Sequence, residues 1–163
     1  MEKILVSACL VGERARYNGI VKSFESHVLK AWNRRGWVVA ICPEVAGGLP
    51  VPRPRSEISE EDGIQVLKGH KKVININGQD VTKYFLDGAQ KALEFASSLG
   101  IRLAILKEGS PSCGSGYIYD GSFSGLKKPG KGVTAVLLEE NDIRVFSERE
   151  IPEAEEYLNK KRR

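Results

Sequence analysis

The stretch IRLAILKEGSPSCG, residues 101–114, indicates the fold most clearly. Its first seven residues are mostly apolar, as is typical of a parallel strand that is buried on both faces. Glycine, serine and proline then predict that the strand ends in a tight loop. A loop of this composition offers a thiol little to pack against, so the position of Cys113 suggests a chemical use for it.

Similar short apolar runs alternate with longer amphipathic runs on the N-terminal side of this stretch. Strands are predicted over residues 3–8 and 37–42, with a helix over 23–36 between them that starts at a serine and ends at a glycine. A longer helix is predicted over 80–100, capped by Asp80 and ended by a glycine. The side chains expected on one side of that helix are Tyr84, Ala92, Leu93, Ala96 and Leu99.

On the C-terminal side, KGVTAVLLEEN (residues 131–141) is ambiguous between helix and strand. Its glycine start, its Glu-Glu end and a short strand predicted over 143–146 favour a helix, and a further helix is predicted over 148–163. The middle segment, 43–79, breaks the alternation with prolines at positions 50, 52 and 54. The run VLKGHKKVININGQD, residues 66–80, then predicts a small hairpin beside the sheet.

This alternation predicts an α/β fold: a Rossmann-like parallel sheet with flanking helices and a small hairpin insertion. The chain has 163 residues, of which 41% are apolar and 28% charged. That length and composition suit one domain over residues 1–163 with one core.

The net charge of +4 comes partly from NKKRR at residues 159–163. We expect a solvated helix end there, with binding of a polyanion as the alternative. No apolar run is long enough to span a bilayer, so we expect a soluble protein with no membrane partner. LVSAC, residues 5–9, resembles a lipoprotein processing site, but it lacks the basic start and the roughly 7–15 apolar residues of a secretory segment. The odd number of cysteines, three, fits a reducing compartment, and a cytoplasmic location is predicted.

The three cysteines share one feature of position. Cys9 follows the first predicted strand, Cys42 ends the second, and Cys113 follows the third. In open α/β folds ligands bind outside the carboxyl ends of the strands, so the three thiols are predicted to meet in one pocket. For Cys42, after Val-Val-Ala-Ile, a buried packing role is the alternative.

The residue types around these thiols limit the chemistry. A structural zinc site needs a fourth protein ligand, and a catalytic cysteine needs a base. His27 lies inside the first predicted helix and His70 in a predicted turn, so neither is placed for either task. The remaining choice is a centre with three thiolates and one open position, either an iron–sulfur cubane or an open catalytic zinc.

Several polar residues lie close to the cysteines in the sequence. Glu44, two residues after Cys42, is a candidate general acid/base, with a capping role or an arginine pair as the alternative. Ser112, next to Cys113, can donate a hydrogen bond to a bound group.

Candidate substrate-binding residues occur in two arginine-containing motifs. Arg14, Arg16 and Tyr17 follow Cys9, and arginines near a pocket suit phosphate or carboxylate recognition. Arg53 and Arg55 can do the same, or they pair with Glu57.

Five motifs, taken in order along nearly the whole chain, resemble the DUF523 family of TudS-type thiouracil desulfidases. They are SACLVGERARYNG (7–19), CPEVAGGLPVPRPRSEI (42–58), DVTKYFLDGA (80–89), LKEGSPSCGSGYIYDGSFSG (106–125) and GKGVTAVLL (130–138). The first motif usually has aspartate before its last glycine, whereas this chain has Asn18, which removes a charge.

The resemblance implies a [4Fe-4S] cluster held by Cys9, Cys42 and Cys113, with one iron not bound by protein. It also implies a non-redox reaction in which Glu44 activates water and Ser112 helps to position the substrate. The implied activity is the removal of sulfur from a thiolated pyrimidine, with release of hydrosulfide.

Thiouracil, 4-thio-UMP and 4-thiouridine in tRNA carry the same reacting group, and the arginines favour a phosphorylated substrate. The alternative function is a non-catalytic iron–sulfur or zinc module for redox sensing or sulfur handling. The sequence gives no indication of oligomeric state.

Overall fold

The structure, a computed structural model, describes residues 2–22 and 24–163 and is built on one parallel sheet. Four strands lie in the order β2-β1-β5-β8, and every neighbouring pair is parallel. The strands are β1 (Ile4–Ser7), β2 (Val38–Ile41), β5 (Leu103–Leu106) and β8 (Arg144–Ser147). Every residue of β1 and β5, which occupy the centre of the sheet, is buried, as their apolar runs predict. The predicted fold class is therefore confirmed.

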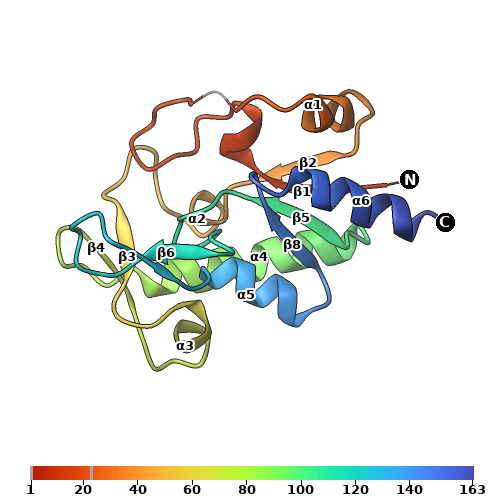
Figure 1. Ribbon diagram of the computed structural model, residues 1–163. Helices are drawn as coiled ribbons and strands as arrows, with labels where there is room; N and C mark the ends of the chain where they lie inside the picture. Colours follow the sequence, from red (N-terminus) through yellow and green to blue (C-terminus); the bar gives the residue numbers. More distant parts are fainter. Residues whose placement is uncertain (1, 23) are drawn as a thin grey trace.

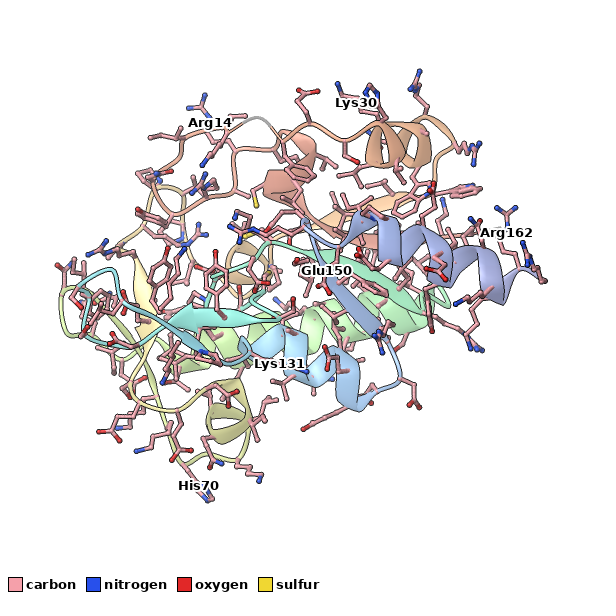
Figure 2. The ribbon with its side chains drawn as sticks, viewed as in Figure 1. Arg14, Lys30, His70, Lys131, Glu150 and Arg162 are labelled. Atoms are coloured by element: carbon pink, nitrogen blue, oxygen red, sulfur yellow. The ribbon has the colours of Figure 1, made fainter. Side chains whose placement is uncertain are left out.

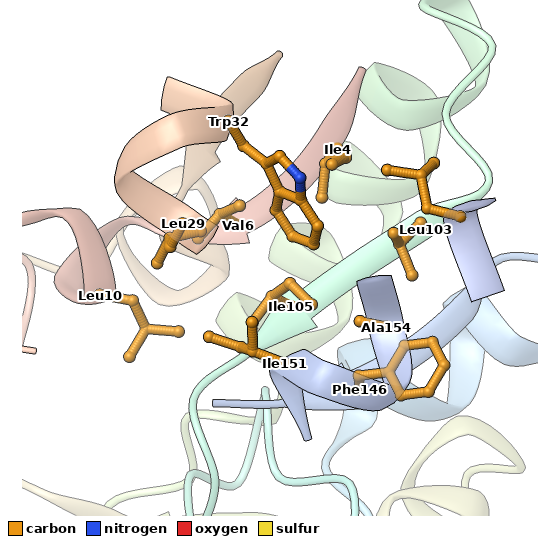
Figure 3. Packing of buried hydrophobic residues seen from close by; sticks show 11 residues of the cluster. Ile4, Val6, Leu10, Leu29, Trp32, Leu103, Ile105, Phe146, Ile151 and Ala154 are labelled. Atoms are coloured by element: carbon orange, nitrogen blue, oxygen red, sulfur yellow. The ribbon is translucent and has the colours of Figure 1, made fainter. Parts of the chain in front are cut away.

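Helices cover both faces of the sheet (Figure 1). One face packs against α1 (His27–Arg34) and α6 (Ile151–Lys161), and Figure 3 shows side chains of this core, with Trp32 and Ile151 beside Ile105. The other face packs against α4 (Thr82–Ser98) and α5 (Val133–Glu140). The ambiguous segment 131–141 thus contains the predicted helix.

The structure corrects the predicted faces and ends of two helices. Tyr84 and Leu99 are 39% and 42% exposed, so the predicted apolar side of α4 is partly wrong. The fully buried stripe of α4 instead contains small residues and one aromatic residue: Phe85, Gly88, Ala89, Ala92 and Ala96. The expected helix start at Ser23 lies outside the described residues, and α1 begins at His27 with the Ser26 hydroxyl accepting the Leu29 N–H.

The middle segment differs from the predicted hairpin. Val66 and Leu67 belong to a short helix, α3 (Gly63–Leu67), and not to a strand. The antiparallel pair is formed by β3 (Ser56–Ile58) and β4 (Val73–Asn75), which lie on either side of that helix in the chain. Local periodicity missed this pairing because the two strands are only three residues long and far apart in sequence.

Three further elements surround the carboxyl edge of the sheet. The 3-10 helix η1 (Ala8–Val11) follows β1, and α2 (Pro43–Ala46) follows β2. A second antiparallel pair, β6 (Tyr117–Tyr119) and β7 (Lys127–Pro129), follows β5. In Figure 1 the two small sheets lie at the end of the parallel strands opposite the chain termini. None of the helices in the described part of the chain is long and apolar enough to cross a membrane.

Candidate active site

A cavity of about 410 Å³ lies at the carboxyl edge of the parallel sheet. Its walls include Ser7 and Ile41, the last residues of β1 and β2, and Lys107, which follows β5. All three cysteines line the cavity, as their places in the sequence predict.

Each cysteine is presented by a different local structure. Cys9 lies in η1, and Cys42 is the N-cap residue of α2. Cys113 lies in the loop between β5 and β6, which docks on the N-terminus of α5. There the N–H of Val133 donates to the carbonyl of Pro111 at 2.8 Å, and the N–H of Thr134 donates to that of Ser112 at 2.9 Å. Free N–H groups at a helix start thus hold the loop that carries the third thiol.

Burial keeps the thiols protonated in the ligand-free protein. It raises the pKa of Cys9 to about 11 and that of Cys113 to about 12, and it also raises the pKa of Cys42. Because the thiolate is the metal ligand, binding a metal centre here would release protons.

The three thiols give the cavity a set of donors that a metal centre can use. They line a common cavity, yet no set of three His, Cys, Asp or Glu side chains in the described residues is arranged to hold a single metal ion. Thiolates are the usual ligands of iron–sulfur clusters, so three thiols around one cavity fit a cluster.

Glu44 lies beside the thiols in the first turn of α2 and forms an ion pair. Its Oε1 accepts a hydrogen bond from Arg53 Nε at 3.1 Å, and the two side chains are only 13% and 3% exposed. This pairing was one of the alternatives for Glu44 that the sequence left open.

The other oxygen of Glu44 faces two serines. Glu44 Oε2 lies 3.1 Å from the Ser112 hydroxyl and 3.3 Å from the Ser110 hydroxyl, and these two hydroxyls are 2.9 Å apart. Ser112 Oγ is also 3.5 Å from the sulfur of Cys113. A carboxylate, two hydroxyls and a thiol therefore form one hydrogen-bonded group at the cavity wall.

The predicted substrate-binding residues separate into two groups. Arg16, Tyr17, Arg53 and Arg55 line the cavity. Arg14 does not; its side chain is exposed and lies at the outer edge of the molecule in Figure 2.

Sequence reasoning missed several lining residues, including Ser110, Lys107, Tyr117 and two buried carboxylates. Glu108 Oε1 accepts the N–H groups of three successive residues, 115–117, at 2.8–3.2 Å. Glu57 Oε1 accepts the N–H groups of Gly121 and Phe123. Both carboxylates therefore order loops around the cavity. The sequence offered a signal for Glu108, which lies in the same loop as Cys113, five residues before it.

The chain is similar to known proteins. A family model described as 2-thiouracil desulfurase matches residues 4–150. The chain is 46% identical over 148 residues to "Uncharacterized protein YbbK" of Bacillus subtilis (strain 168), covering 91% of this chain and 97% of that protein. A solved structure described as a [4Fe-4S]-dependent thiouracil desulfidase, TudS, superposes with a TM-score of 0.89 at 46% identity, covering 98% of this chain and 99% of the other.

Proposed function

Since the chain belongs to the 2-thiouracil desulfurase family, we propose that it is a [4Fe-4S]-dependent desulfidase acting on a thiolated pyrimidine. The observation that carries the proposal is the convergence of three thiols and the Glu44–Ser112 pair on one cavity. The similar solved structure, described as [4Fe-4S]-dependent, supports the cofactor.

In this proposal Cys9, Cys42 and Cys113 hold the cluster through their thiolates. The cluster, when bound by three protein ligands, supplies an iron with an open position that acts as a Lewis acid toward the substrate sulfur. The protein residues then have two tasks, which are to hold the pyrimidine and to manage the protons of water.

Glu44 is the proposed general base. Water adds to the ring carbon that carries sulfur, and Glu44 accepts one of its protons. The carbon–sulfur bond then breaks with its electron pair on sulfur, Glu44 returns its proton to that sulfur, and the remaining hydroxyl proton of the added water passes to solvent as the ring carbonyl forms. The products are an oxo-pyrimidine and hydrosulfide, so the reaction is a hydrolysis and needs no external electrons.

Ser112 is placed to support this proton transfer. Its hydroxyl lies between Glu44 Oε2 and the sulfur of Cys113, at 3.1 and 3.5 Å. A group at that point can hydrogen-bond to a substrate held against the thiols while Glu44 remains within reach.

The cavity favours a phosphorylated substrate over the free base. Arg16 and Arg55 place positive charge in the wall of this cavity of about 410 Å³, which holds the cluster as well as the substrate, and arginine suits phosphate recognition. Aromatic rings of Tyr17 and Tyr117 also line it and offer surfaces for stacking on a base. We therefore propose 4-thio-UMP ahead of 2-thiouracil and of 4-thiouridine in tRNA. We also propose the cytoplasmic location that the odd number of cysteines in the sequence predicts.

Anaerobic reconstitution followed by a hydrosulfide assay tests the proposal. We expect iron and sulfide to bind, and each substrate turnover to yield one hydrosulfide and one oxo-pyrimidine. Glu44→Gln is expected to keep its iron and lose about 10²-fold or more in kcat, which is the usual contribution of a general base. Glu153→Gln, an exposed position on α6, is the matched control.

Two outcomes would overturn the proposal. A fully loaded protein that releases no hydrosulfide from 2-thiouracil, 4-thio-UMP or 4-thiouridine would be a binding module. Full zinc occupancy with no iron after reconstitution would exclude the cluster.

A further inference from the structure

Arg53 stands apart from the other arginines of the cavity because its side chain is buried. We propose that Arg53 is a positioning residue that acts through Glu44 and not a contact for the substrate. This inference rests on the role proposed above for Glu44, but the contacts that support it are independent of the substrate.

The guanidinium of Arg53 is occupied by protein groups. Nε donates to Glu44 Oε1 at 3.1 Å, Nη1 to the carbonyl of Pro50 at 3.1 Å, and Nη2 to the carbonyl of Ala15 at 2.8 Å. Nη2 also lies 3.9 Å from the sulfur of Cys42. A guanidinium has five N–H donors in a fixed fork, and these contacts to protein groups occupy most of them.

Burial supports the same assignment. The Arg53 side chain is 3% exposed, which leaves almost no surface for a ligand. Arg55, two residues later, is exposed, and its side chain donates from Nη2 to the carbonyl of Phe123 at 3.3 Å. Arg55 therefore has more donors and more exposed surface to offer to a phosphate than Arg53 has.

The contacts also show what Arg53 does for the site. Holding Glu44 Oε1 fixes the carboxylate so that Oε2 faces the Ser112 hydroxyl. The bond to Ala15 ties the segment that follows Cys9 to the loop that follows α2. A planar fork can make these bonds together, whereas a lysine ammonium is a point charge and cannot hold the same geometry.

A double-mutant cycle on the reconstituted enzyme tests the inference, with kcat normalised to bound iron. Arg53→Met is expected to lower kcat by about 10²-fold, as a misplaced catalytic group does, with KM changed by less than about threefold. Combined with Glu44→Gln, it should add little to the loss caused by Glu44→Gln alone. Arg53→Lys keeps the positive charge but not the planar fork, so its kcat is expected to stay below about a tenth of the wild-type value.

Contrasting variants give the controls. Arg55→Met should raise KM for 4-thio-UMP and leave kcat nearly unchanged, and Arg102→Met, exposed before β5 at the opposite end of the sheet, should change neither. The inference is overturned if Arg53→Met raises KM about tenfold at unchanged kcat, or if its effect multiplies with that of Glu44→Gln. If Arg53→Met does not fold, the same double-mutant cycle with Glu44→Gln is measured with Arg53→Lys in its place.

Unfolding of the cluster-free protein separates this inference from the proposed function. Removing one partner of a buried ion pair leaves an unpaired charge, which costs more than removing both. Arg53→Met should therefore melt at a lower temperature than Arg53→Met/Glu44→Gln, even if no substrate is turned over. The reverse order would refute the Arg53–Glu44 coupling without bearing on the desulfidase activity.

Discussion

Gly88→Ala tests how the fold holds Glu44 in place. Gly88 lies on the buried side of α4, directly under α2. A Cβ at residue 88 would stand 1.9 Å from the carbonyl oxygen of Pro43, and real Cβ atoms essentially never come within 3.0 Å of another atom. The obstacle is backbone, so α2 must move by the difference, about 1.1 Å.

The expected magnitude follows from two opposing effects. Alanine gains about 1 kcal/mol of helix propensity over glycine. Overpacking costs about 1–3 kcal/mol, and a contact with rigid backbone belongs at or above the upper end of that range. The net loss in the free energy of unfolding is then about 2 kcal/mol or slightly more, or roughly 4–8 °C in Tm for a domain of this size. A shift of about 1 Å in Glu44 should lower kcat by about 10²-fold.

Urea unfolding followed by circular dichroism gives the stability change, and hydrosulfide release at saturating substrate gives kcat. Gln90→Ala, an exposed position on the same helix, is the control and should match the wild type in both. If Gly88→Ala is more stable than the wild type and turns over substrate at the same rate, the close approach of α2 and α4 is refuted.

Three further changes probe the site. Ser112→Ala should lower kcat about tenfold through loss of one hydrogen bond, at unchanged iron content; an unchanged rate of hydrosulfide release would remove Ser112 from the reaction. Glu108→Gln should lower the free energy of unfolding in urea by about 2 kcal/mol, because charge-assisted bonds to three N–H groups are weakened; equal stability would contradict that anchoring role. In the cluster-free protein the pKa of Cys9 is raised to about 11, so as the pH rises the thiol ionises in the unfolded state before it ionises in the folded state. Between pH of about 9 and 11 the unfolded state therefore binds fewer protons than the folded state, and the free energy of unfolding should fall as the pH rises through this range. Iodoacetamide labelling of Cys9 should accelerate over the same range, and labelling that is already fast at pH 7 would show that the thiol is not buried.

The parallel sheet and the meeting of the three cysteines could be predicted from local sequence patterns. Apolar runs such as Leu103–Leu106 are local signals, because a strand buried on both faces must be continuously apolar. Parallel strands with right-handed crossovers place all carboxyl ends at one edge, so thiols that follow three strands must converge. The convergence of Cys9, Cys42 and Cys113 required no knowledge of side-chain contacts.

The roles of the polar residues could not be predicted in this way, because they depend on contacts between distant segments. Arg53 and Arg55 are indistinguishable in PRPR, yet one is buried against Glu44 and the other is exposed. Glu44 meets Ser112 across 68 positions of the chain. A hydrogen bond forms only if its two groups are positioned to within a few tenths of an ångström, and here they come from segments that no local pattern relates. The burial of a strand, in contrast, can be recognised from the composition of that segment alone.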